Sequence, residues 1–97
     1  MKWGETMISV VVPVYNQKRQ LQLTLDFFSR QIVDESFERI VVDDCSDEPC
    51  DTVVDNFKDK MDVIYIKNAI NRGRSYSRNV GIEKSTGEII VFCDADR

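Results

Sequence analysis

The sequence predicts an α/β fold in which helices pack on a mainly parallel sheet. Four short runs rich in valine and isoleucine alternate with three segments whose apolar residues recur at helical spacing. The order is β-α-β-α-β-α-β, and short connections of this kind favour a parallel sheet with right-handed crossovers. The 97 residues have room for one hydrophobic core, so we expect a single domain with a flexible tail over residues 1–6.

Residues 7–14 form the first predicted strand, because the run is apolar almost throughout and Pro13 is placed to mark its end. Asn16 is then expected to cap a helix over residues 17–31. The apolar stripe of this helix consists of Leu21, Leu25 and Phe28, with Phe27 and Ile32 at its flanks.

The second predicted strand covers residues 37–42 and leads into two adjacent carboxylates. Helix-start residues follow at Ser46, Asp47 and Pro49, and the buried face of that helix is assigned to Val53, Val54 and Phe57. Residues 63–66 give a third strand. A polar turn over residues 68–73 precedes a helix over residues 75–84, which Gly87 is expected to end at the C′ position. The fourth strand covers residues 88–93.

Composition narrows the class of protein. With 42% hydrophobic and 31% charged residues, the chain is typical of a soluble globular domain. Its formal charge of −4 gives no overall attraction to nucleic acid, and no apolar run reaches the length of a membrane span or a secretory signal. Three cysteines without a CxxC pair, and no histidine, favour reduced structural thiols over a zinc site. We therefore expect a cytoplasmic location.

Polar side chains follow three of the predicted strands, at Tyr15 and Asn16, at Asp43 and Asp44, and at Asp94 and Asp96. Because ligands of parallel sheets bind at the carboxyl ends of the strands, we expect these groups to meet on one rim. Asp94 and Asp96 share a face of an extended segment and suit Mg²⁺ or Mn²⁺. Taken alone, such a pair is more often a solvated strand end.

The other polar groups also allow two interpretations. One carboxylate of Asp43 and Asp44 is predicted to face the cleft and the other the loop, and spacing does not decide which. Arg74 and Arg78 share a helix face and can meet a diphosphate, although arginines on a helix usually form a solvated face. Gly73, in the turn with Arg72, favours the ligand interpretation slightly because glycine permits a close backbone approach.

Several motifs follow one another along the chain. They are VVVPVYN at 10–16, IVVDDCS at 40–46, NRG at 71–73, SRN at 77–79, GI at 81–82, and GEII at 87–90 followed by DAD at 94–96. In this order, and over nearly the whole chain, they resemble the family 2 glycosyltransferases of GT-A fold, which have a Rossmann-like, mainly parallel sheet.

The resemblance implies a nucleoside-diphosphate sugar donor, most often a UDP-sugar, and an inverting transfer to an acceptor hydroxyl, as in cell-surface polysaccharide synthesis. Carried over by position, the nucleotide-binding residues are Pro13, Tyr15, Asn16, Asp44, Arg78, Asn79 and Asp94. Asp96 matches the direct metal ligand, with Asp94 beside it, and Mn²⁺ or Mg²⁺ would neutralise the leaving diphosphate.

The resemblance also implies that the acceptor site and the general base lie beyond Arg97. We therefore expect residues 1–97 to be the donor-binding half of a GT-A domain, inactive alone, with any membrane association carried by a later part. The edge of residues 88–93 would then be bare and free to pair with a second copy.

Two other classes are weighed against this one. Receiver-like signalling modules also use parallel α/β sheets with acidic strand ends and bind magnesium, but here the acidic pair ends the second strand. A dinucleotide-binding domain is disfavoured because no GxGxxG follows the first strand.

Overall fold

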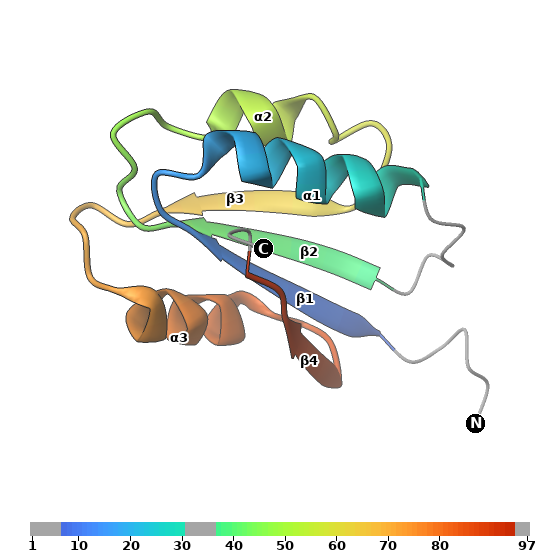
Figure 1. Cartoon of the computed structure of the whole chain (residues 1–97). Helices are drawn as coiled ribbons and strands as arrows, with labels where there is room; N and C mark the ends of the chain where they lie inside the picture. The colour runs from blue at the N-terminus through green and yellow to red at the C-terminus, as the bar shows by residue number, and fades with distance from the viewer. Residues whose placement is uncertain (1–6, 31–36, 95–97) are drawn as a thin grey trace.

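The computed structural model describes residues 7–30 and 37–94. In this part of the chain four parallel strands form one sheet in the order β3-β2-β1-β4. The strands are β1 (Ile8–Val14), β2 (Phe37–Asp43), β3 (Val63–Lys67) and β4 (Ile89–Phe92), and the helices are α1 (Lys18–Arg30), α2 (Asp51–Asp55) and α3 (Arg74–Lys84). Helices α1 and α2 cover one face and α3 covers the other (Figure 1). The α/β fold predicted from the sequence is confirmed.

The core lies on both faces of β1 and β2 because alternate residues of a strand point to opposite sides. On the α1 and α2 face, Val10, Val12 and Val14 pack in one cluster with Leu21 and Leu25. On the α3 face a smaller buried cluster consists of Val11, Ile40 and Val42, with Val80 and Ile90 packed against it. The predicted helical stripe is confirmed at Leu21 and Leu25, whereas Phe27 is 60% exposed.

The first strand is predicted correctly, but the cap of the first helix is not. Strand β1 ends at Val14, the last residue of the predicted range and one residue after Pro13. The Val11 carbonyl accepts the Cys93 N–H on the β4 side, and the Val14 carbonyl accepts the Asp44 N–H on the β2 side. The missing N–H of Pro13 therefore points to the β4 side, beyond the last residue that pairs with β4. Asn16 does not cap α1: it has a φ of 54°, and the carbonyl of Gln17 accepts the first helical N–H bond.

The start of α2 and the residue that ends α3 also differ from the prediction. Helix α2 begins at Asp51, after the predicted start residues, because backbone N–H groups in that loop bond to Asp43. Gly87 is not a C′ residue, since Ser85 ends α3 in an extended conformation. A Cβ on Gly87 would lie 2.5 Å from the Ser9 hydroxyl and 2.8 Å from the Met7 carbonyl oxygen. Close approach to β1 therefore explains the glycine.

Strand β4 lies at the edge of the described sheet and pairs with β1 alone among the described strands. Ile89, Val91 and Phe92 are each between 43% and 46% exposed. Within the described residues no helix is long and apolar enough to span a membrane. The predicted tail over residues 1–6 lies outside the described residues.

Candidate functional site at the carboxyl ends of the strands

The loop that follows β1 contributes one wall of the candidate site. Pro13, Val14, Tyr15 and Gln17 line a cavity there, and Tyr15 is 45% exposed. Asn16 is turned away to the neighbouring loop: its backbone N–H donates to Ser46 Oγ at 2.9 Å, and its Oδ1 accepts the Asp47 N–H at 2.8 Å. The left-handed backbone of Asn16 thus tethers the β1–α1 loop to the β2–α2 loop.

The two carboxylates after β2 have different roles. Asp43 is fully buried and accepts four hydrogen bonds, from the Ser46 N–H and hydroxyl, the Cys50 N–H and the Tyr65 hydroxyl. Burial raises the pKa of Asp43, but these bonds outweigh it and hold the pKa below its ordinary value. Burial and the negative charge of Asp43 raise the pKa of the Cys50 thiol to about 11. Asp43 organises the loop and does not line the cavity.

Asp44 lines the cavity and holds the turn that precedes α3. Its Oδ1 accepts the Arg72 N–H and its Oδ2 the Gly73 N–H, both at 2.8 Å. Gly73 has a φ of 95°, a conformation that favours glycine, and it stands at the N-cap position of α3. Asp44 therefore fixes the turn that brings Asn71 and Gly73 to the cavity wall.

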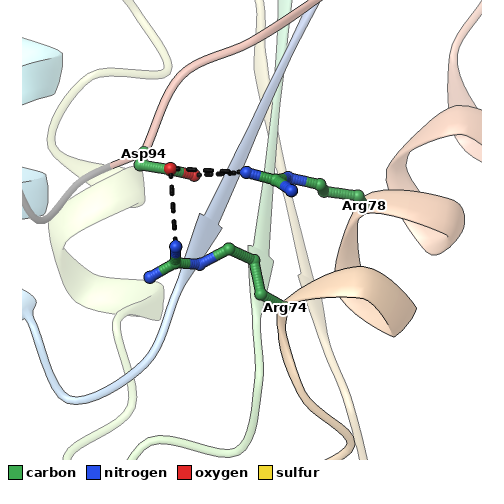
Figure 2. Close-up of polar contacts among 3 residues, drawn as sticks. All are labelled: Arg74, Arg78 and Asp94. Atoms are coloured by element: carbon green, nitrogen blue, oxygen red, sulfur yellow. Dashed lines mark hydrogen bonds and ion pairs between the residues drawn. The ribbon is translucent and has the colours of Figure 1, made fainter.

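Asp94, two residues after β4, lies between two arginines of α3 (Figure 2). Arg78 Nη2 is 3.4 Å from both oxygens of Asp94, and Arg74 Nη1 is 3.8 Å from Oδ2. The guanidinium carbon of Arg78 also lies 5.5 Å from the ring centroid of Phe92. Because Arg74 and Arg78 are four residues apart, one face of α3 presents both cations to this carboxylate.

These loops enclose a cavity of about 410 Å³, which has the size of a small-ligand pocket. Its lining residues are Pro13, Val14, Tyr15, Gln17, Asp44, Asn71, Gly73, Arg74, Ser77 and Asp94. The predicted convergence of three strand ends is observed for Tyr15, Asp44 and Asp94. Neither Asn16 nor Arg78 nor Asn79 lines the cavity, and Asp96 lies outside the described residues.

The residues weighed for the site from the sequence did not include four lining residues, Val14, Gln17, Asn71 and Ser77. Gln17 is in the loop next to the predicted Tyr15, so its position beside the strand end was the available signal. Ser77 is one helical turn after Gly73 and is fully buried. Its signals were its place in the SRN motif at 77–79 and a small polar side chain on the sheet-facing side of the helix.

The cavity offers the type of donor atom that a divalent cation prefers, a carboxylate oxygen. Asp94 brings carboxylate oxygen to the cavity, and Mg²⁺ and Mn²⁺ prefer oxygen ligands. Among the residues that the structure describes, no group of three or more Asp, Glu, Cys or His side chains is arranged to hold a metal. One or two carboxylates with substrate phosphates are the usual protein contribution to a magnesium site.

The fold and the cavity define an α/β protein with a pocket where its parallel strands end. The chain belongs to glycosyltransferase family 2, because the model of that family, Glycosyl transferase family 2, matches residues 9–97. The resemblance noted from the sequence motifs is therefore confirmed.

Relatives and solved structures agree with this membership. An uncharacterised glycosyltransferase of Haemophilus influenzae is 39% identical over 93% of this chain, which spans 29% of that protein. The structure of Staphylococcus aureus TarS residues 1–349 in complex with UDP-GlcNAc has a TM-score of 0.87 at 30% identity, covering 93% of this chain and 26% of that one. The mannosyltransferase PcManGT from Pyrobaculum calidifontis, in complex with GDP-Man and Mn²⁺, has a TM-score of 0.83 at 25% identity, covering 94% and 28%.

Proposed function

We propose that the cavity binds the nucleoside diphosphate of a sugar donor, and that the whole protein transfers the sugar to an acceptor hydroxyl with inversion. The observation that carries the proposal is the meeting of Tyr15, Asp44 and Asp94, from three separate strand ends, on one cavity. The TarS complexes with UDP-GlcNAc and with UDP support a nucleotide-sugar ligand. Family membership leaves the receiver-like alternative without support.

The chemistry of the lining suggests how a donor is oriented. Tyr15 offers an exposed ring for stacking on a base, and Asp44 beside it offers a hydrogen-bond acceptor. Arg74 supplies positive charge at the Asp94 end of the cavity, where a diphosphate is bound in this proposal. We assign uridine as the nucleoside, following the TarS ligands. Arg78 and Asn79 are not on the lining, so Arg78 acts through Asp94.

We propose that Asp94 and Asp96 hold Mn²⁺ or Mg²⁺, which neutralises charge on the nucleoside diphosphate as it leaves. The proposal rests on the oxygen donor that Asp94 brings to the cavity. The roles of the described chain are to orient the nucleotide and to place this carboxylate. In PcManGT the metal bound together with the sugar nucleotide is Mn²⁺.

A general base for the acceptor hydroxyl is assigned to another part of the protein. The carboxylates among the described cavity-lining residues are Asp44 and Asp94, and both are assigned to the donor. This chain spans 29% of the Haemophilus influenzae relative and 16% of TarS. We therefore propose that residues 1–97 are an incomplete domain that binds a donor without transferring its sugar.

The exposed β4 edge gives a proposal about this chain in isolation. The apolar residues of β4 are half-exposed. On the outer side of β4, no described strand pairs with its backbone N–H and C=O groups. We propose that two copies of residues 1–97 associate through this edge. Analytical ultracentrifugation should show a dimer that Val91→Lys weakens; a monomer at every concentration would exclude the pairing.

The function is tested by titrating the protein with UDP, GDP and ADP, with and without Mn²⁺, by calorimetry. We expect UDP to bind most tightly and to depend on the metal. Asp94→Ala and Asp96→Ala should remove the metal dependence. Asp59→Ala, at an exposed carboxylate before β3 and so at the other end of the sheet, is the matched control. Binding that Mn²⁺ leaves unchanged would disprove the metal assignment, and no binding of any nucleotide would disprove the donor site.

A further inference from the structure

Asn68 lies directly after β3, away from the cavity lining, and is only 7% exposed. Its side-chain amide donates to Asp44 Oδ1 at 2.9 Å and to Ser77 Oγ at 3.0 Å. Because a carboxylate accepts hydrogen bonds and does not donate them, the group that faces Asp44 is the NH₂ end of the amide. Both amide hydrogens are therefore used, one on each partner.

This contact decides which oxygen of Asp44 has acceptor capacity left. Oδ1 accepts from Asn68 and from the Arg72 N–H, which fills the two lone-pair sites of a carboxylate oxygen. Oδ2 accepts from the Gly73 N–H alone among the described residues. One acceptor site thus stays on Oδ2 of a residue that lines the cavity.

We propose that Asn68 is a positioning residue that sets nucleobase selectivity by holding Asp44 with Oδ2 toward the base. This inference rests on the proposed donor-binding function. A fixed acceptor matches the ring N–H on the pairing edge of uracil or guanine. Cytosine and adenine place a ring nitrogen acceptor there, so two acceptors would face each other and one buried polar group would lose its bond.

Removing the amide should affect the base and spare the phosphates. In Asn68→Ala, Oδ1 loses one of its two donors, so the carboxylate gains freedom to rotate about its side-chain bonds. Arg74, at the Asp94 end of the cavity, is not a hydrogen-bond partner of Asn68. The backbone N–H of Asn68 still donates to the Asp43 carbonyl, a bond of 2.8 Å that any residue keeps.

The test measures dissociation constants of UDP, CDP and inorganic pyrophosphate for the wild-type protein and for Asn68→Ala. We expect UDP binding to weaken by about fivefold to tenfold, the loss of one net hydrogen bond. Pyrophosphate binding should change less than about twofold on the same scale. Asn56→Ala, at an exposed asparagine after α2, is the matched control. Asn68→Ser, whose side chain is too short to bond both groups, should give the same selective loss if the alanine variant does not fold.

A double-mutant cycle separates positioning from a general structural role. If Asn68 acts through Asp44, Asn68→Ala should change neither nucleotide further in an Asp44→Ala background. Equal losses for UDP and pyrophosphate, or additive effects of the two substitutions, would overturn the inference. If the wild-type protein binds UDP and both Asn68 variants still prefer UDP to CDP to the same degree, the inference is wrong and the proposed function stands. Wild-type protein that binds no nucleotide would overturn the proposed function as well.

Discussion

Replacing Asp43 by Asn should destabilise the protein by an amount that its contacts determine. Four donors point at this buried carboxylate: the Ser46 N–H at 2.9 Å, the Ser46 hydroxyl at 2.6 Å, the Cys50 N–H at 3.1 Å and the Tyr65 hydroxyl at 2.5 Å. In Asp43→Asn one oxygen keeps its two donors, while the new NH₂ group faces the other two. Two bonds to a charged acceptor are lost at about 1.5–3 kcal/mol each, so the free energy of unfolding should fall by at least about 3 kcal/mol.

Tyr65→Phe provides a milder version of the same perturbation. It removes one of the four donors and keeps the ring, so we expect a loss of about 2 kcal/mol. Both values come from urea unfolding at pH 7, with the midpoint shift converted through the slope of the transition. Since a domain of this size has about 5–15 kcal/mol of stability, Tyr65→Phe should still fold where Asp43→Asn is marginal.

The pH dependence has a definite sign. Because the pKa of Asp43 is lower in the folded protein than in the unfolded chain, its contribution is fully present above the unfolded value of about 3.9. The contribution is lost as the pH falls through the lower folded value. The stability gap between wild type and Asp43→Asn should therefore narrow in acid. A gap below about 0.5 kcal/mol at pH 7, or one that stays constant down to pH of about 2, would refute the role given to this carboxylate.

Two further predictions concern packing and the opposite end of the sheet. A methyl group on Gly81 would meet the side chain of Val11, and overpacking of about 1–3 kcal/mol exceeds the helix propensity gained, about 1 kcal/mol. Gly81→Ala should therefore lower the melting temperature, with exposed Glu83→Ala as the control; a higher value contradicts the contact. Glu38 accepts hydrogen bonds from Ser9 and the α3–β4 connection that outweigh its burial and lower its pKa. Glu38→Gln should cost about 1 kcal/mol at pH 7 and less in acid, and equal effects at both pH values in urea unfolding contradict it.

The fold was predictable because its strands are short apolar runs and its longer helices have apolar residues at helical spacing. Continuous β-branched runs gave β1 and β2, and the spacing of Leu21 and Leu25 gave α1. The errors are at the ends of elements, where side chains compete for backbone groups. Asp43 takes the Cys50 N–H, which a helix starting at Ser46 would have bonded to the Ser46 carbonyl, so α2 begins late. Single-residue propensity contains no information about the side-chain bonds of Asp43, which join residues three and seven positions apart.

The sequence was enough to predict that the candidate site lies at the edge of the sheet where the strands end. Parallel strands end at one edge, so Tyr15, Asp44 and Asp94 had to converge once the strands were placed. Which of the two adjacent carboxylates faces the cavity depends on the pairing of β2 with both neighbours, which alternation does not supply. Asn68 was beyond prediction because its function lies in two contacts with other elements.

The charge of the site explains why a cation belongs to the proposed function. Asp44 and Asp94 contribute two negative charges, and Arg74 and Arg78 offset them, so these four described groups sum to zero. A nucleoside diphosphate brings further negative charge, for which this set offers no net attraction. Either the arginines would exchange Asp94 for the diphosphate, or Asp94 would hold a divalent cation that supplies positive charge for the diphosphate. In both cases Asp94 must change partners, and in the second the affinity for UDP rises with Mn²⁺ while the affinity for uridine does not.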